Sequence, residues 1–266
     1  MNKRYIGALF LAPLLIFLFI GGMPLKILTV VLSLLGLYEF FKVVKQGKIK
    51  PFSFLAYALT LVYYFLLKTQ INYDIFTLGL ILITLLMLCI PIINIEYTFI
   101  DVAVTILGFI YVSVFFSFIV LVNNKTYGNY LIWFIFLSSW LCDTSAYYAG
   151  RLLGKRKLCP KVSPKKTIEG SIGGMIGSIL ACTVYGQILV SKNILNIDIY
   201  HFVILGAICG ILCQFGDLVA SSIKRYVGVK DYSNLIPGHG GILDRFDSIL
   251  FSAVVVYYYL TLIIGI

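Results

Sequence analysis

Four aspartates stand in or beside apolar runs in the second half of the sequence: Asp143, Asp217, Asp244 and Asp247. A carboxylate at mid-bilayer costs on the order of 2.5–3.5 kcal/mol on insertion scales, so each needs a partner or a function. Asp244 and Asp247 are three residues apart at the start of a predicted helix, which places them on one face, and Asp217 can approach from the preceding helix. Carboxylates that converge in this way are suited to a hard cation such as Mg²⁺.

Basic side chains surround the same aspartates in the sequence. Carboxylates suited to a metal, together with cations suited to phosphate, indicate a site for phosphate chemistry. The alternative for any single aspartate is a helix N-cap or an ion pair, and for Asp244 alone the sequence does not decide between the two. The loop around His239 is rich in glycine, which lets backbone amides approach a ligand, although a lone histidine is equally compatible with a structural role. The basic residues in question are Lys165, Lys166, Lys224, Arg225, Lys230 and Arg245.

The amino-acid composition indicates that the chain lies in a membrane. With 61% hydrophobic residues, 12% charged residues and a mean hydropathy of +1.00, the 266 residues have too little polar surface for a soluble globule. Apolar runs close to the roughly 20 residues that a helix needs to cross a bilayer recur along the chain. We predict an all-α bundle, a polytopic integral membrane protein with about nine transmembrane helices over residues 5–23, 25–41, 52–67, 75–93, 102–122, 130–149, 168–190, 202–223 and 246–266.

The distribution of basic residues predicts the orientation of these helices. If nine helices alternate, 17 of the 21 Lys and Arg residues fall on one side. The positive-inside rule then places the N-terminus in the cytosol and the C-terminus outside. The net charge of +10 is therefore interpreted as a topology signal rather than as a sign of nucleic-acid binding. The four informative aspartates all lie about 5–10 Å inside the cytosolic boundary.

We expect a single membrane domain over residues 1–266, because no repeat or flexible linker divides the chain. Residues 1–128 are mainly N-terminal transmembrane helices, and residues 129–266 carry the catalytic helices and two long cytosolic loops, 150–167 and 224–245. Pro160 and Pro164 predict a shaped loop rather than a helix in the first of these. Six scattered cysteines indicate neither a disulfide framework nor a zinc site. Small residues at helical spacing predict close helix packing at Gly170, Gly173, Gly174 and Gly177.

Residues 221–247 resemble the signature of the phosphatidate cytidylyltransferase family. The matching residues are Ser221-Ser222-Ile223-Lys224-Arg225, Lys230-Asp231 and Ile236-Pro237-Gly238-His239-Gly240-Gly241-Ile242-Leu243-Asp244-Arg245-Phe246-Asp247. Asp143-Thr144-Ser145-Ala146-Tyr147, Gly150-Arg151, Ser163-Pro164-Lys165-Lys166-Thr167, Glu169-Gly170 and Gly216-Asp217-Leu218 are similar to the same family. Together these stretches cover most of residues 142–247. Two departures stand out, because many members of the family have Asn in place of Cys142 and Gly in place of Ser145.

The resemblance implies a polytopic enzyme that joins CTP to phosphatidic acid, forms CDP-diacylglycerol, releases pyrophosphate and needs Mg²⁺, with one metal ion or two. It implies that Asp217, Asp244 and Asp247 are metal ligands and, with Lys224 and Arg225, form the catalytic group. The remaining residues of the matching stretches are expected to bind substrate: Asp143, Ser163, Lys165, Lys166, Thr167, Ser221, Lys230, Asp231, His239, Gly240, Gly241 and Arg245.

The expected partners are CTP, phosphatidic acid and membrane lipids, with no nucleic acid, and a homodimer is an open alternative. The expected location is a bacterial inner membrane with the active site facing the cytosol. Three other classes of protein are alternatives. A polyprenol or phytol kinase would transfer the γ-phosphoryl group of CTP, a transporter would place ionisable groups near mid-membrane, and a structural scaffold would leave the clustered aspartates unexplained.

Overall fold

The computed structural model describes residues 15–67, 73–236, 238 and 240–266. Most of the first predicted helix, residues 5–23, lies outside the described residues, and so does His239. Residues 15–20 are helical, and this helix ends at Gly21, whose φ of 64° is a left-handed conformation that favours glycine. The next helix begins at Gly22.

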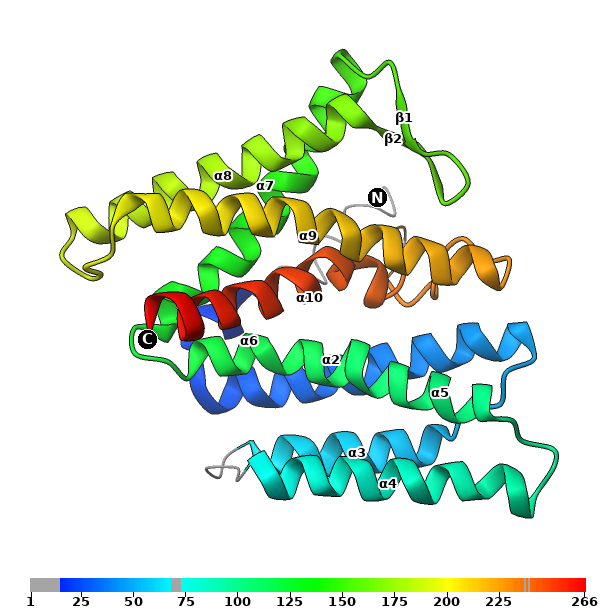
Figure 1. Ribbon diagram of the computed structural model, residues 1–266. Coiled ribbons are helices and arrows are strands. Elements are labelled where there is room, and N and C mark those ends of the chain that lie inside the picture. The colour runs from blue at the N-terminus through cyan, green and yellow to red at the C-terminus, as the bar shows by residue number, and fades with distance from the viewer. Residues whose placement is uncertain (1–14, 68–72, 237, 239) are drawn as a thin grey trace.

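The rest of the described chain is mostly helical, and the longer helices lie side by side (Figure 1). A π-helical segment joins α5 to α6, so residues 99–123 form one continuous helix. Eight of the nine predicted runs therefore correspond to helices in the described part of the chain. The elements are α2 (Gly22–Val44), η1 (Lys45–Gly47), α3 (Ser53–Leu66), α4 (Tyr73–Ile93), α5 (Phe99–Gly108), η2 (Phe109–Val114), α6 (Phe115–Asn123), α7 (Gly128–Leu152), β1 (Lys157–Cys159), β2 (Ser163–Thr167), α8 (Ile168–Ser191), α9 (Ile199–Tyr226), α10 (Leu243–Tyr258) and η3 (Tyr259–Ile264).

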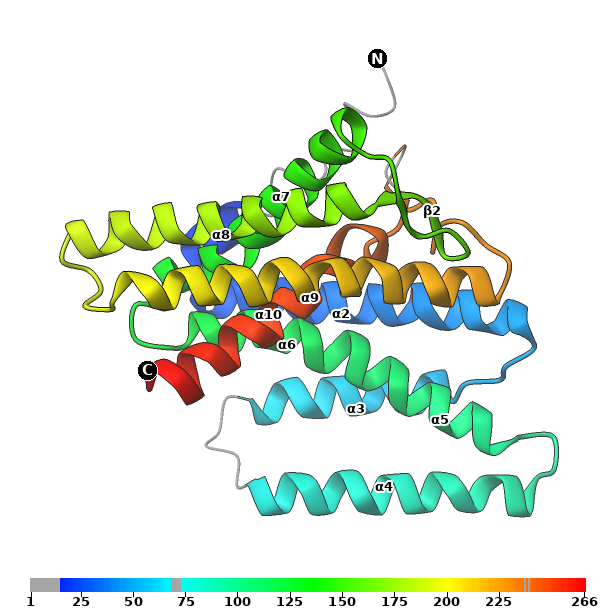
Figure 2. The same cartoon turned by 45° about the horizontal axis from the view of Figure 1, so that its top comes forward.

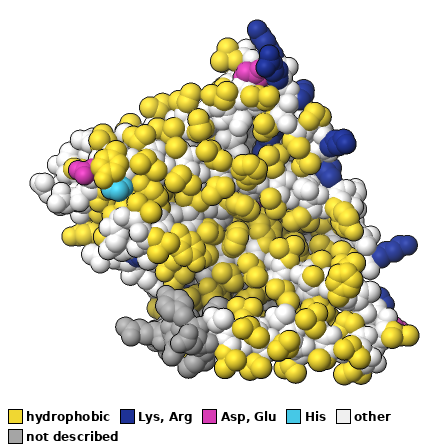
Figure 3. All heavy atoms as spheres, viewed as in Figure 1, with side chains coloured by type: hydrophobic (Ala, Val, Ile, Leu, Met, Phe, Trp, Pro, Cys, Tyr) yellow, Lys and Arg dark blue, Asp and Glu magenta, His cyan; other side chains and the backbone are white. Residues whose placement is uncertain are grey.

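The chain is an integral membrane protein, as its composition predicts. Within the described residues, five helices are long and apolar enough to cross a membrane, and Ser53–Leu66 and Thr77–Ile93 are shorter apolar helices. Large hydrophobic side chains are exposed along these helices and cover most of the visible face (Figure 3). The number of nine spans stays a prediction. The five long helices are Gly22–Gly47, Phe99–Asn123, Ile168–Ser191, Ile199–Tyr226 and Leu243–Ile264.

Polar loops and basic side chains gather at one end of the bundle. Figures 1 and 2 both place the end of α2, the β1–β2 hairpin and the end of α9 at the same end, and the C-terminus at the other. Lysine and arginine side chains line this end in the space-filling view (Figure 3). The helices therefore alternate in direction, and the segregation of charge agrees with the alternation assumed from the sequence.

The loop between α7 and α8 contains a two-stranded antiparallel hairpin, which the all-α prediction missed. Lys157 pairs with Thr167, and Cys159 pairs with Ser163. The prolines exclude a helix here, as expected, but three- and five-residue strands are too short to show a period-two pattern. At the end of β2 the Thr167 hydroxyl accepts a hydrogen bond from the Gly170 amide and so caps the N-terminus of α8.

The glycines of α8 pack against α7, as predicted from their spacing. A Cβ atom at Gly174 would lie 3.0 Å from the Ala146 Cβ atom, and one at Gly177 would lie 2.2 Å from the Ser145 hydroxyl oxygen. Small residues on α8 therefore let the two helix backbones approach each other. All six cysteines are free thiols.

Candidate active site

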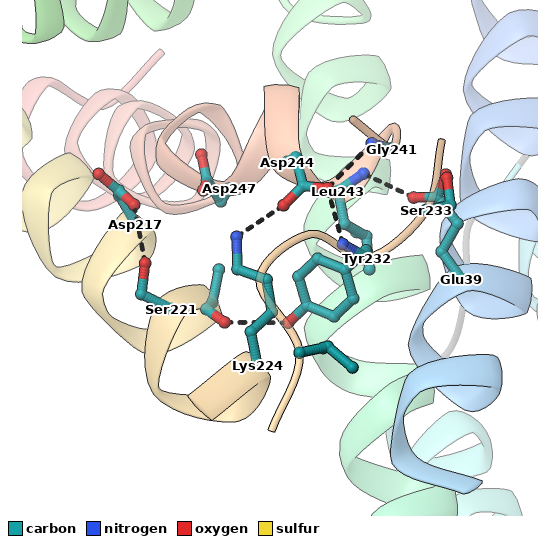
Figure 4. Close-up of polar contacts among 12 residues, drawn as sticks. Glu39, Asp217, Ser221, Lys224, Tyr232, Ser233, Gly241, Leu243, Asp244 and Asp247 are labelled. Carbon is teal, nitrogen blue, oxygen red and sulfur yellow. Dashed lines mark hydrogen bonds and ion pairs between the residues drawn. The ribbon is translucent and has the colours of Figure 1, made fainter. Parts of the chain in front are cut away.

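A buried ion pair joins α9 to α10 at the basic end of the bundle (Figure 4). The Lys224 ammonium donates to Asp244 Oδ1 at 2.6 Å, and the two side chains are 9% and 4% exposed. Lys224 comes from the last turn of α9, and Asp244 comes from the first turn of α10. Both charges sit at favourable ends of their helix dipoles, with the cation at a C-terminus and the anion at an N-terminus.

Asp244 also fixes the loop that connects these helices. Its Oδ2 atom accepts hydrogen bonds from the Tyr232 amide at 2.8 Å and from the Gly241 amide at 2.9 Å. Gly240 has a φ of 81°, and a Cβ atom there would lie 2.9 Å from Asp244 Oδ2. Burial, with the negative charge nearby, raises the pKa of Tyr232 well above its ordinary value, so its hydroxyl stays neutral and donates to the Ala220 carbonyl.

A second buried carboxylate reaches the same loop from the first half of the chain. Glu39 of α2 is 1% exposed and accepts hydrogen bonds from the Ser233 hydroxyl and from the Ile242 and Leu243 amides. Glu39 is not among the residues predicted for the site from the sequence. The sequence does carry a signal for Glu39, because it is an acid inside an apolar run. The same criterion identified Asp143 and Asp217.

Asp217 lies farther into the bundle on α9 and connects it to the hairpin. Its Oδ2 atom lies 2.5 Å from the Lys166 ammonium nitrogen, and its Oδ1 atom accepts a hydrogen bond from the Ser221 hydroxyl at 3.3 Å. Lys166 belongs to β2, so the short hairpin positions the Lys166 ammonium group beside α9. The sequence predicted that these residues belong to one site, and the structure brings them together.

Asp143 and Asp247 meet through Ser248. The Ser248 hydroxyl donates to Asp143 Oδ2 at 3.1 Å, while its amide donates to Asp247 Oδ1 at 2.8 Å. Asp143 and Asp247 each interact electrostatically with Asp217. Carboxylates from α7, α9 and α10 therefore converge in one region, as their common depth in the sequence predicted.

A cavity of about 380 Å³ opens beside Asp217. Its walls come from the end of α7, the hairpin, the start of α8 and the middle of α9. Cationic, aromatic and carboxylate groups share these walls, so the cavity can hold an anionic ligand that also has a flat apolar part. Residues that carry this chemistry are Asp143, Tyr147, Arg151, Lys165, Lys166 and Asp217.

Other predicted residues lie at the margin of this region. Arg225 is exposed and donates to the Val229 carbonyl, and Lys230 and Asp231 are exposed on the loop before Tyr232. Arg245 is exposed and interacts electrostatically with Asp143. Ser163 starts β2 and is half-buried.

The donor chemistry of this region fits the divalent cation that the sequence predicted, because carboxylate oxygens are the ligands that Mg²⁺ prefers. Among the described residues, however, no three His, Cys, Asp or Glu side chains are already close enough together to hold a metal ion. Asp217 is paired with Lys166, and both oxygens of Asp244 are engaged by Lys224, Tyr232 and Gly241. Of the three predicted ligands, Asp244 is thus the one most committed to other partners.

Carboxylates paired with lysines at one end of a helical membrane bundle indicate a functional site, and such lysines are suited to binding phosphate groups. The chain belongs to the cytidylyltransferase family, whose model matches residues 2–263. It is 32% identical over 270 residues to a phosphatidate cytidylyltransferase of Bacillus subtilis, covering 98% of each chain. A phosphatidate cytidylyltransferase of Staphylococcus saprophyticus is 44% identical over 156 residues, or 59% of this chain and 58% of that protein. One from Staphylococcus aureus is 40% identical over 158 residues, with the same coverage.

Proposed function

We propose that this protein is a nucleotidyltransferase that converts CTP and phosphatidic acid into CDP-diacylglycerol and pyrophosphate. The observation that carries the proposal is the arrangement of Asp143, Asp217, Asp247 and Lys166 beside a cavity at the basic end of the bundle. Membership of the cytidylyltransferase family and the names of the relatives support the same reaction.

The chemistry requires cations more than it requires a general base. A phosphate monoester has its second pKa near 6, so the lipid phosphate is already an anionic nucleophile at neutral pH. Its attack on the α-phosphorus of CTP is opposed by repulsion between two anions. We infer that Lys165 and Lys166 bind phosphate groups in the cavity and that Lys224 keeps the adjoining α9–α10 junction in place.

A divalent cation would neutralise the phosphate oxygens and the leaving pyrophosphate when it is bound. Asp217 and Asp247 are the residues that we propose to hold it, and Asp143 adds a third carboxylate nearby. Asp244 was also predicted as a ligand, and its contacts here give it a second role, which is to hold the Tyr232 and Gly241 amides.

The depth of the site suits both substrates. A lipid phosphate lies at the membrane interface while its acyl chains stay in the bilayer, and CTP arrives from the cytosol. We propose that the lipid headgroup enters laterally between helices at the basic end, which faces the cytosol of a bacterial cell. The product released from CTP separates this reaction from that of a CTP-dependent kinase, because the transferase releases pyrophosphate and the kinase releases CDP. Release of CDP by the purified protein would overturn the proposal.

The proposed topology makes a separate prediction. With nine spans and a cytosolic N-terminus, the C-terminus lies outside the cytosol. Alkaline phosphatase fused after Ile266 should be active, and green fluorescent protein fused at the same position should be dark. A fluorescent C-terminal fusion with inactive phosphatase would contradict the nine-span arrangement while leaving the reaction untouched.

Lys166 gives a test of phosphate binding. We expect Lys166→Gln to lower kcat/KM for CTP by about 100-fold, or about 2.8 kcal/mol, because it removes a cation from the cavity and leaves Asp217 unpaired. Steady-state kinetics in detergent micelles would measure the change. Lys161→Gln is the matched control, since Lys161 is exposed in the turn between the strands. A Lys166→Gln enzyme with kcat/KM equal to that of the control would contradict the assignment.

A further inference from the structure

Glu39 is a buried acid whose side-chain hydrogen-bond partners, among the described residues, lie in the second half of the chain. Its carboxylate reaches from α2 to the segment before α10 (Figure 4). It accepts from the Ser233 hydroxyl at 2.6 Å and from the Ile242 and Leu243 amides at 2.9 Å each. No lysine, arginine or histidine in the described part of the chain forms an ion pair with it. Among the described residues, two backbone amides and one hydroxyl group, rather than a counter-ion, therefore satisfy this charge.

These two amides belong to the start of α10. The first N–H groups of a helix have no partner within it, and the N-cap residue of α10 is Ile242, whose side chain cannot accept a hydrogen bond. Glu39 performs the capping from another helix. Its negative charge also stands at the positive end of the α10 dipole. The position of the first turn of α10 thus depends on a residue about 200 positions earlier in the sequence.

The same short segment is held from its other side by Asp244, which bonds the Gly241 amide. Gly241 lies against Glu39, because a Cβ atom there would come within 2.5 Å of Glu39 Oε2. Glycine at this position therefore leaves room for the carboxylate. The backbone amides of Gly241, Ile242 and Leu243 therefore all donate to carboxylates, the first to Asp244 of α10 and the other two to Glu39 of α2.

We propose that Glu39 is a positioning residue for the reaction. It sets the first turn of α10, which carries Asp244 and Asp247, against Lys224 and Asp217 on α9. It touches no reacting atom, since its contacts are to the loop and the helix start. The inference rests on the proposed function, and it gives the N-terminal half of the chain a part in catalysis.

Glu39→Gln is the direct test. The amide keeps one acceptor oxygen and replaces the other by an N–H donor, so at least one of the three present donors faces another donor. We expect kcat to fall at least about tenfold, because small displacements of reacting groups are costly. The KM values for CTP and phosphatidic acid should stay within about twofold, because the cavity residues are unchanged. Glu39→Asp, which restores both oxygens on a shorter stem, should recover part of kcat.

A structural control separates positioning from loss of folding. Ser33→Ala removes another buried hydrogen bond of α2, the bond to the Tyr64 hydroxyl of α3, which does not involve the loop. It should lower thermal stability in detergent and leave kcat per folded protein unchanged. If Glu39→Gln behaves in the same way, with lower stability and wild-type kcat, the proposal is wrong.

Ser233→Ala provides a milder variant should Glu39→Gln not fold. It removes one donor to Glu39 and leaves both α10 amides bonded, so kcat should fall about two- to fivefold, the effect of a modest hydrogen bond. Wild-type kcat in this variant would count against the proposal. A wild-type enzyme that makes no CDP-diacylglycerol defeats the proposed function, whereas an active wild type with unaltered variants defeats this inference alone.

Discussion

Asp247→Asn is expected to lower kcat at least about 100-fold, the scale of losing one group that stabilises charge in a transition state. Asp247 is 8% exposed, and its carboxylate interacts electrostatically with Asp217. Asparagine has nearly the same shape and can still accept from the Ser248 amide, so the fold should survive. Lipid product formed at increasing Mg²⁺ concentrations would measure the loss.

The control for this variant is Asp198→Asn. Asp198 is exposed at the start of α9, at the opposite end of that helix from Lys224. Its removal should leave turnover and magnesium dependence as in the wild type. Full magnesium-dependent turnover by a folded Asp247→Asn enzyme would contradict the assignment of Asp247 to the metal site.

Lys224→Met is expected to destabilise the protein and to abolish turnover together. It leaves the buried Asp244 carboxylate without its counter-ion, which typically costs about 3–5 kcal/mol. The loop held by Asp244 would loosen as a result. Thermal unfolding in detergent and initial rates on the surviving folded protein are the two measurements.

The double variant Lys224→Met with Asp244→Asn separates these effects. The second change removes the unpaired charge, so most of the lost stability should return, while activity should not. A Lys224→Met enzyme with wild-type stability and turnover would show that the ion pair has no role in the site. Recovery of activity in the double variant would show that the pair is purely structural.

Much of the site could be predicted from the sequence, because a charged side chain inside an apolar membrane segment costs free energy and is therefore conspicuous. Asp143, Asp217 and Asp247 interrupt apolar runs at a common depth, and the structure places them in one region. Hydropathy also located the described helices, since the backbone of a membrane protein must satisfy its own hydrogen bonds. The spacing of the α8 glycines predicted close helix packing, and the structure shows that the partner helix is α7.

Other features required the fold. Glu39 is an acid inside an apolar run, but only the packing of α2 against the loop shows which groups it bonds. The pairing of Lys224 with Asp244 rather than with Asp217 depends on how the loop returns α10 to α9. The hairpin that carries Lys166 is too short for a periodic signal.

The most direct measurement is to supply the purified protein with phosphatidic acid, CTP labelled at the α-phosphorus and Mg²⁺, and to analyse the lipid. We expect labelled CDP-diacylglycerol together with an equimolar amount of pyrophosphate, and loss of both when EDTA removes the metal. A folded preparation that leaves the lipid unlabelled would contradict the proposed reaction, and labelled lipid that persists in EDTA would contradict the role of the carboxylates as metal ligands.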